Sequence, residues 1–546
     1  MAQPPTPDDE ERLFDLAIVG GGVNGAGLAR DAAMRGLGVL LLDKGDAGGG
    51  TSAWSTRLIH GGLRYLEHGE LRLVREALRE RETLLKIAPH LVRPLPLLIP
   101  VYAGQRRGPL LVRAGMLAYD LLSFDKTLAS HRALTRDETL RLAPALRTEG
   151  LRGASLYMDA QVEFPERLVI ENLLDARARG ASVKTHARVT RIVVEDGRAV
   201  GVEYADELRG RAHDARGRTH EARARVVVNA AGPWVDEVLD GSPLARERLI
   251  GGTKGSHIVV AQFDGAPACA VYAEATRDAR PFFVIPWQGR VLIGTTDTRH
   301  EGDLDSVAAT EEEIDYLLAE TNRVLPSARL ARGDVLYSYA GVRPLPYTAR
   351  GATAAITRRH FTRDHAPEVE NFFSLVGGKL TTYRSLAEQA TDLVFKKLGR
   401  SAPPCETARV PLPGASFKTG ESFEQFSASF INECALPEAT ALRFVRVYGS
   451  RAEDLLEFAR ARAHLLAPLD DASDALAAEI PFAFEREMAA TLTDCLMRRT
   501  MLGLNDESGL DVIEPAAEVA REYFGWGEAR VRDELRLYQE YVRRFR

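Results

Sequence analysis

A short glycine-rich turn near the start of the chain constrains its fold more than any other feature. Gly20, Gly22 and Gly25 have the spacing G-x-G-x-x-G and follow directly on the apolar run 16–19. A strand that leads through such a turn into a helix points free backbone N–H groups and the positive end of the helix dipole at a bound pyrophosphate. The spacing alone is weak evidence in a chain with 46 glycines, so its context decides.

The residues that follow complete a βαβ unit. Residues 26–36 have the small side chains of a helix packed on a sheet, and residues 39–42 form a second apolar run that ends at Asp43. An acid about 20 residues after the glycines is placed to accept hydrogen bonds from ribose hydroxyls, although Asp43 could equally cap the turn. The unit predicts dinucleotide binding and does not separate NAD from FAD. The predicted contacts of this unit are Gly20, Gly22, Val23, Asn24, Gly25 and Asp43.

Composition limits the class of protein. A chain of 546 residues is too long for one core, so two or three domains are expected. A net charge of −6 gives no electrostatic case for nucleic acid as a partner. Residues 1–12 are rich in proline and acids, predict a disordered tail and lack the pattern of a signal peptide. No apolar run is long enough to cross a bilayer.

The four cysteines do not predict a metal centre. Cys269, Cys405, Cys434 and Cys495 are far apart, and none belongs to a C-x-x-C pair. An iron–sulfur cluster or a zinc site is therefore not expected, and neither is a disulfide framework. Redox chemistry in this chain must come from an organic cofactor.

The order of predicted elements indicates a mixed architecture. Strands are predicted at 182–194 and 199–205, at 257–261, and at 281–287 and 290–296 around the turn Gln288-Gly289. Segments that combine a strand with glycines recur at 16–25, 226–232 and 374–380, and this scatter favours FAD over NAD. We predict an α/β + α fold: a Rossmann-like FAD-binding domain interleaved with an antiparallel-sheet substrate domain, then a C-terminal helical domain. The expected ranges are 13–90, 150–250 and 335–400 for the first, 91–149 and 251–334 for the second, and 405–546 for the third.

Three helices have amphipathic patterns. In residues 69–88 charged residues alternate with leucine and valine, and the charged face is expected to be solvated. Residues 110–122 are rich in apolar residues and flanked by arginines, which fits either a packed helix or an interfacial helix on an anionic membrane. In the last predicted helix the apolar residues are spaced 4, 3, 4 and 3, which indicates packing or dimerisation, with membrane docking as the alternative. Those residues are Val531, Leu535, Tyr538, Val542 and Phe545.

Several long strings carry a resemblance to a known family. They are Thr51-Ser52 with residues 58–67, and residues 254–260, 293–297, 341–345, 355–358 and 377–384. In order and spacing they resemble the respiratory FAD-dependent glycerol-3-phosphate dehydrogenases over nearly the whole chain. The resemblance implies oxidation of sn-glycerol 3-phosphate to dihydroxyacetone phosphate, with electrons passed through FAD to a membrane quinone. It also implies a cytoplasmic homodimer, peripheral on the inner face of the cytoplasmic membrane.

The resemblance implies roles for individual residues. A phosphomonoester favours forked donors, and Arg343 and Arg358 would hold it. Arg64, Tyr65 and Lys379 would lie against the substrate or the reactive face of the flavin. The remaining FAD contacts would be Thr51, Ser52, Leu58, Ile59, His60, Gly61, Val189, Ala230, Gly232, Gly378, Lys379, Leu380 and Thr381.

The proton acceptor has more than one candidate. Removing the hydroxyl proton of an alcohol needs a base whose pKa is near the working pH. His257, between Gly255-Ser256 and an apolar strand, is the favoured candidate, and His60 is its rival beside the isoalloxazine ring. Lys379 could instead stabilise negative charge on the alkoxide or the reduced flavin, and Arg343 completes the catalytic set.

Three other functions remain open at this point. The same substrate could reduce oxygen to hydrogen peroxide, as in a glycerol-phosphate oxidase. An FAD-dependent amine, amino-acid or 2-hydroxy-acid oxidoreductase would need one arginine for a carboxylate, so the set of several arginines argues against it. The last alternative is a flavoprotein that docks a partner without catalysis.

Overall fold

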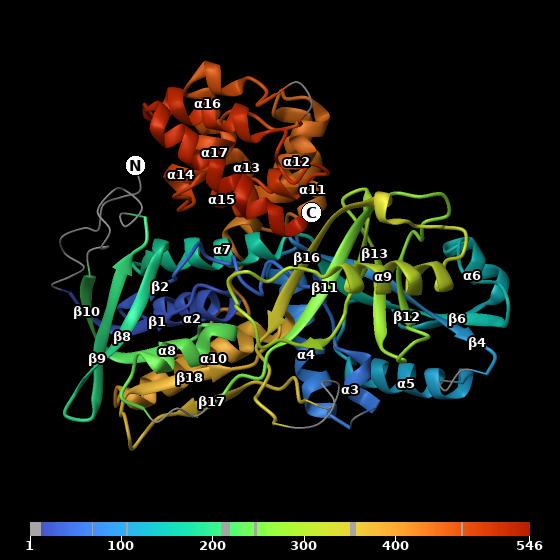
Figure 1. The fold of residues 1–546 in the computed structure, drawn as a ribbon, viewed down its shortest axis with the longest axis horizontal. Helices are drawn as coiled ribbons and strands as arrows, with labels where there is room; N and C mark the ends of the chain where they lie inside the picture. The colour runs from blue at the N-terminus through green and yellow to red at the C-terminus, as the bar shows by residue number, and fades with distance from the viewer. Residues whose placement is uncertain are drawn as a thin grey trace.

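The computed structural model describes residues 12–67, 69–104, 108–208, 219–244, 248–349, 356–470 and 473–546. The side chains of Arg64, Glu67 and Pro109 lie outside this description, and so does most of the predicted tail 1–12. Two sheets lie side by side, and a helical domain covers one edge of both (Figure 1). The predicted α/β + α class is confirmed.

The first sheet is built around the predicted βαβ unit. Its central strand, β1 (Leu13–Val19), pairs in parallel with β2 (Val39–Leu42) on one side and with β10 (Thr219–Asn229) on the other. Leu16 and Ile18 face one core while Ala17 and Val19 face another, as the two-residue period of a strand requires. The order of strands is β17 (Phe361–Asp364), β18 (Phe372–Val376), β10 (Thr219–Asn229), β1 (Leu13–Val19), β2 (Val39–Leu42) and β7 (Ser182–Lys184).

Three helices cover one face of this sheet. They are α2 (Val23–Met34), α7 (Pro165–Ala178) and α10 (Tyr383–Lys397), and α2 packs against both others. The predicted hairpin of β8 (Ala187–Glu195) and β9 (Arg198–Asp206) packs on the other face. It is joined to the sheet because β9 pairs antiparallel with the first half of β10. The short helix α8 (Val235–Asp240) follows β10.

The second sheet is mainly antiparallel. Its strands are β15 (Thr298–Arg299), β11 (Thr253–Ala261), β14 (Arg290–Gly294), β13 (Pro281–Trp287), β12 (Ala270–Glu274), β4 (Val92–Tyr102), β6 (Leu151–Val162) and β3 (Leu58–Ile59) in order, with β16 (Val335–Arg343) on β11 and β5 (Arg132–Thr135) on β6. The turn between β13 and β14 is the predicted one, and Gln288 and Gly289 both have positive φ. Helices α6 (Arg136–Leu142) and α9 (Glu311–Val324) pack against this sheet.

This sheet corrects the predicted domain boundaries. Residues 150–250 and 335–400 were assigned to the FAD-binding domain, yet β6 and β16 belong to the second sheet. The reason is pairing: β6 runs along the whole length of β4, and β16 along β11. Partners in a sheet are set by long-range register, which a local apolar pattern does not reveal.

Part of the charged face of α4 (Leu71–Ile87) is buried, which corrects the expectation of a solvated face: Glu80, Arg81 and Glu82 are buried, whereas Arg72, Arg79 and Lys86 are exposed. Arg81 has no exposed surface, and its Nη1 lies 2.6 Å from Oδ1 of Asp159. Glu80 pairs with Arg384 of α10, with 2.7 Å between Oε1 and Nη2. Buried charges need such partners, because an unpaired charge away from water costs several kcal/mol.

Helix α5 (Pro109–Leu122) has a packed face and an exposed face. Met116 and Tyr119 are buried against the core, whereas Leu110, Leu117 and Leu121 are 83%, 57% and 75% exposed. The helix lies beside α3 (Leu63–Glu67), on the opposite side of the molecule from the C-terminal helices (Figure 1). Two of the flanking arginines, Arg106 and Arg107, are outside the described residues.

The C-terminal domain is helical, as predicted. Tyr538 and Val542 are at most 2% exposed and pack into their own domain, whereas Phe545, 3% exposed, packs against Trp54 of the first domain. These three side chains of the apolar stripe are therefore not available for membrane docking. The helices are α11 (Phe423–Glu433), α12 (Glu438–Tyr448), α13 (Ala452–Arg460), α14 (Glu479–Arg486), α15 (Leu492–Asp494), α16 (Ile513–Phe524) and α17 (Glu528–Val542), followed by a 3₁₀ turn at Arg543–Phe545.

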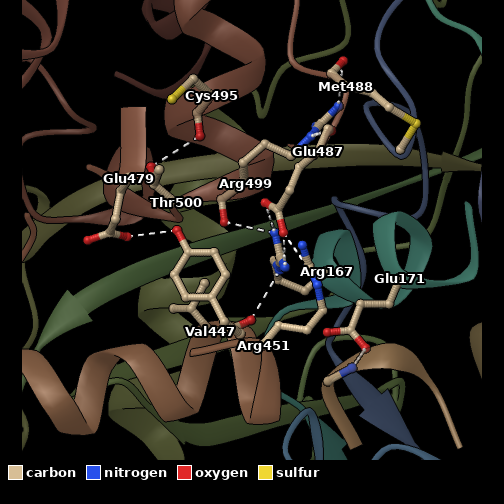
Figure 2. A network of polar contacts seen from close by, with 12 residues as sticks. Arg167, Glu171, Val447, Arg451, Glu479, Glu487, Met488, Cys495, Arg499 and Thr500 are labelled. Atoms are coloured by element: carbon tan, nitrogen blue, oxygen red, sulfur yellow. Dashed lines mark hydrogen bonds and ion pairs between the residues drawn. The ribbon is translucent and has the colours of Figure 1, made fainter. Parts of the chain in front are cut away.

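Buried ion pairs join this domain to the first one. Arg167 of α7 donates two hydrogen bonds to the carboxylate of Glu487, at 2.6 and 2.7 Å, and a third to the carbonyl oxygen of Val447 (Figure 2). Arg451 also donates to Glu487. The two guanidinium groups hold the pKa of Glu487 at about 2, since their attraction outweighs the effect of burial. In the described part of the chain, no helix is long and apolar enough to cross a membrane.

Candidate active site

One cavity of about 770 Å³ collects nearly all of the predicted site residues. Its wall includes the ends of β1 and β2, residues of β11 and β16 from the second sheet, and Tyr541 of α17. The following predicted residues line it: Gly20, Gly22, Val23, Asn24, Asp43, Thr51, Ser52, Leu58, His60, Tyr65, Val189, Ala230, Gly232, His257, Arg343, Arg358, Gly378, Lys379, Leu380 and Thr381.

Glycine is required at one end of the cavity by close packing. A Cβ on Gly20, where φ is +108°, would lie 2.7 Å from the carbonyl oxygen of Ala230. A Cβ on Gly25 would lie 1.9 Å from the carbonyl oxygen of Gly20. The turn therefore brings the ends of β1 and β10 together and leaves the first turn of α2 open to the cavity, which is the arrangement that accepts a phosphate.

Asp43 fills the capping role and also lines the cavity. Its Oδ2 accepts a hydrogen bond from the Gly21 N–H at 2.6 Å, and its Oδ1 accepts one from the Gly45 N–H at 2.8 Å. Burial raises the pKa of Asp43, because the loss of water outweighs the two backbone hydrogen bonds. Each carboxylate oxygen has a second lone pair, so the same side chain can also accept a hydrogen bond from a ribose hydroxyl.

Three predicted cofactor residues do not line the cavity. Gly25 packs beneath the turn, and Ile59 is fully buried. The N–H of Gly61 donates to the hydroxyl of Tyr119 at 2.9 Å, which makes it part of the core beneath α5. The side chain of Arg64 is outside the described residues, so its predicted role stays a prediction.

A cluster of charges lies where the second sheet meets the cavity. Nη1 of Arg343 is 3.2 Å from Oδ1 of Asp297, and Nη2 of Arg358 is 3.4 Å from Oδ2. Burial lowers the pKa of Arg343 to about 10, which still leaves it charged at neutral pH. The two arginines outweigh burial at Asp297 and lower the pKa of its carboxyl group. A Cβ on Gly255 would lie 2.2 Å from Nη2 of Arg343, so glycine makes room for the guanidinium.

Lys379 is a buried amine without a hydrogen-bond partner in the described residues. Its Nζ lies 3.6 Å from the centre of the Tyr65 ring. Burial lowers the pKa of Lys379 to about 7, although the carboxylates of Glu70 and Glu76 act in the opposite direction. The amine therefore exchanges between its charged and neutral forms near physiological pH.

His257 is buried and held as a neutral ring. Its Nε2 is 2.9 Å from Oγ1 of Thr56, and its ring stacks on Tyr339 with 4.8 Å between the centres. Burial, followed by the nearby Arg343 and Arg57, lowers the pKa of His257 well below its usual value. Its Nδ1 has no partner in the described residues. Burial likewise lowers the pKa of His60, which is edge-on to the ring of Phe283.

The comparisons with known proteins agree with this geometry. A family model described as FAD dependent oxidoreductase matches residues 15–393, and a model described as C-terminal domain of alpha-glycerophosphate oxidase matches residues 405–531. A glycerol-3-phosphate dehydrogenase from Synechocystis is 45% identical, with 98% of this chain and 97% of the relative covered. The chain belongs to the FAD-dependent glycerol-3-phosphate dehydrogenase family.

Two further proteins place the chain within this dehydrogenase family. A D-erythritol 1-phosphate dehydrogenase from Brucella abortus is 38% identical, over 90% of this chain and 95% of that one. The crystal structure of the glycerol-3-phosphate dehydrogenase from Bacillus halodurans, complexed with FAD, matches with a TM-score of 0.78 at 29% identity and covers 98% of this chain and 96% of that chain. The cofactor of this family is FAD.

The cavity fits FAD by its own chemistry. The open start of α2 offers backbone donors to a pyrophosphate, and five buried polar atoms of cavity-lining residues lack hydrogen-bond partners in the described chain: Oδ1 of Asn24, Nε of Arg57, Nε1 of Trp234, Nδ1 of His257 and Nζ of Lys379. Buried polar groups are rarely left unpaired without a ligand or water to satisfy them. When bound, FAD supplies the two-electron acceptor that the side chains of this dehydrogenase lack.

Several residues of the cavity, and one of the charge cluster beside it, were not found from the sequence. Asp297 ends one of the family strings, 293–297, yet no role was assigned to it. The available signal was an acid in the same set of strings that contains Arg343 and Arg358. Thr56 holds His257 and had no distinctive pattern. Arg498, Tyr541 and Arg544 line the cavity from the C-terminal domain, and nothing local in the sequence connects them to a cofactor.

Proposed function

We propose that this chain oxidises sn-glycerol 3-phosphate to dihydroxyacetone phosphate and passes the electrons to a membrane quinone. The observation that carries the proposal is the pair Arg343 and Arg358 on the wall of the FAD cavity, in a chain whose relatives act on phosphorylated polyols. Two guanidinium groups match the charge and the forked geometry of a phosphate dianion.

Asp297 prepares these arginines for the substrate. It pairs with both guanidinium groups and keeps them side by side before a phosphate arrives. The donors that Asp297 leaves unused on the two guanidinium groups remain for the oxygens of a phosphate.

Lys379 is the proton acceptor of the proposed reaction. The hydroxyl proton of the substrate moves to Nζ of Lys379 while the hydrogen on the same carbon leaves as hydride, for which FAD would be the two-electron acceptor when bound, so the carbon–oxygen bond becomes a carbonyl. A pKa of about 7 suits an acceptor at neutral pH. His257, favoured by the sequence pattern, has a pKa far below neutrality, and its contact with Thr56 suits a positioning role.

The exposed face of α5 supports a membrane-peripheral protein. Leu110, Leu117, Leu121 and Phe124 are all more than half exposed, and the exposed Arg113 lies on the same helix. A face of this kind lies in the interface of a bilayer and would bring the enzyme to a lipid-soluble acceptor. The alternative acceptor is oxygen, as in a glycerol-phosphate oxidase.

An anaerobic reduction assay tests the proposal. Glycerol 3-phosphate added to the purified holoenzyme should bleach the flavin absorbance, whereas glycerol, which has no phosphate, should not. Flavin that stays oxidised with glycerol 3-phosphate but bleaches with D-erythritol 1-phosphate would move the substrate to a longer polyol phosphate. Reoxidation by a quinone analogue that is much faster than by oxygen supports the quinone, and the reverse order identifies an oxidase.

A further inference from the structure

The C-terminal domain supplies part of the wall of the FAD cavity. Arg498, Tyr541 and Arg544 line it, next to Gly49 and Trp54 of the first domain. Tyr541 and Arg544 lie beyond residues 405–531, the range that the C-terminal family model matches. The βαβ unit that predicts dinucleotide binding lies entirely in the first domain. The presence of side chains from the C-terminal domain on the cavity wall therefore suggests that they have a role in the site.

The segment that carries Arg544 is anchored against the first domain. Phe545 is 3% exposed, and its ring lies 5.0 Å from that of Trp54. The hydroxyl of Ser338 donates to the carbonyl oxygen of Phe545 at 3.4 Å. Trp54 is in turn fixed by a hydrogen bond from its Nε1 to the carbonyl oxygen of Gly49, at 3.1 Å. Arg544 is therefore held in place from both domains.

The charges on this wall are not balanced. Arg498 and Arg499 both donate to the carboxylate of Asp46, and Arg498 also pairs with Asp494 at 2.9 Å. Arg544 stacks on Tyr541, with 4.2 Å from its Cζ to the ring centre, and its Nε donates to the carbonyl oxygen of Tyr541. No carboxylate of the described chain pairs with Arg544. Asp46 and Asp494 are thus taken up by Arg498 and its neighbours, and Arg544 is left without a carboxylate partner in the described chain.

The same loop connects this wall to the phosphate end of the cavity. The hydroxyl oxygen of Ser52 accepts a hydrogen bond from the Val23 N–H at 3.0 Å, at the open start of α2. Gly49, three residues earlier, is next to Arg498, because a Cβ on it would lie 3.9 Å from Cζ of that arginine. The pyrophosphate is the only group of FAD that is negatively charged at neutral pH, so it is the anion that an unpaired arginine on this wall would meet.

We propose that Arg544, stacked on Tyr541 and anchored through Phe545, binds the pyrophosphate of FAD and makes the C-terminal domain part of the cofactor site. The stacking fixes the guanidinium plane in advance, so little side-chain entropy is lost when the phosphate binds. The proposal depends on FAD binding and not on the identity of the substrate.

Titration of the apoprotein with FAD tests this assignment, followed by quenching of flavin fluorescence. Arg544→Ala should raise the Kd for FAD about tenfold, as expected for one charge-assisted hydrogen bond, and should flatten its dependence on salt. Arg543→Ala is the matched control, since Arg543 is exposed on the same 3₁₀ turn, does not line the cavity and carries the same charge. Equal Kd values for the two variants would overturn the proposal.

Competition with inorganic pyrophosphate separates phosphate binding from a structural role. Pyrophosphate should compete with FAD for the wild-type apoprotein and for Arg543→Ala, and about tenfold more weakly for Arg544→Ala. Arg544→Lys keeps the charge and should retain the salt dependence. If Arg544→Ala weakens FAD and leaves competition by pyrophosphate unchanged, the arginine does not bind the phosphates. Because no substrate is added, failure of the dehydrogenase reaction would leave this result intact.

Discussion

The two ends of the FAD cavity are built on different principles. At the glycine turn, backbone groups and absent side chains make the site, because a Cβ on Gly20 or Gly25 would collide with a backbone carbonyl oxygen. At the substrate end, buried side-chain charges make it, with Arg343 and Arg358 around Asp297 and an unpaired amine on Lys379. Backbone suits a constant cofactor, whereas side chains can be tuned to a substrate and a reaction.

The largest effect is expected from a substitution at the glycine turn, the end of the cavity that is built from backbone. Gly25→Ala puts a Cβ 1.9 Å from a carbonyl oxygen that cannot move without separating β1 from α2. We expect protein that retains no flavin and unfolds at a lower temperature, measured by the ratio of flavin to protein absorbance and by a thermal melt.

A control outside the cavity is Gly115→Ala. Gly115 lies within α5 and does not line the cavity, and a Cβ added to it would have no heavy atom within 4 Å. This variant should keep its flavin. Equal loss of flavin in both variants would mean that the loss does not come from the close approach at Gly25.

The second effect removes charge from the substrate end. Arg358→Ala should lower kcat/KM for glycerol 3-phosphate about 100-fold, chiefly through KM, because a buried phosphate would lose one of its two guanidinium partners. Flavin content should not change. Arg359→Ala removes the same charge from the exposed neighbouring residue and should have little effect on steady-state rates. A large flavin loss in Arg358→Ala would show that this arginine also holds the cofactor, so the two ends of the cavity would not have separate roles.

The smallest effect is a pH dependence at Lys379. Below a pKa of about 7 the amine is protonated and cannot accept a proton, so kcat/KM should rise with pH and level off above about 7. Lys379→Gln should be slow at every pH and lose this inflection. His257→Gln should keep the inflection, because the pKa of His257 lies far below it. An inflection that disappears with His257 and persists without Lys379 would reverse the two roles.

The contrast between the ends also explains what the sequence could predict. The βαβ unit and the β13–β14 hairpin were predicted because glycines, turns and two-residue periods are local signals. Most of the predicted residues that line the cavity followed from long strings typical of one family. Asp297 was missed because its role depends on Arg358, 61 positions away, which no local pattern encodes.

Buried charge was the main source of error. The charged face of α4 has the same pattern as a solvated face, yet Glu80 is paired with Arg384, 304 positions away. The assignment of β6 and β16 failed for a related reason, since strand partners are chosen across the whole chain. Composition and periodicity report which residues avoid water, whereas they do not report which charges have found a buried partner.

The contact between Arg167 and Glu487 has a consequence for how such chains can be recombined. One partner lies in the range of the first family model and the other in the range of the second. A chimaera that takes its C-terminal domain from a relative without a matching acid would leave Arg167 charged in a dry interior, at a cost of about 3–5 kcal/mol. The two matched domains are therefore exchanged successfully only as a pair, although two separate family models describe them.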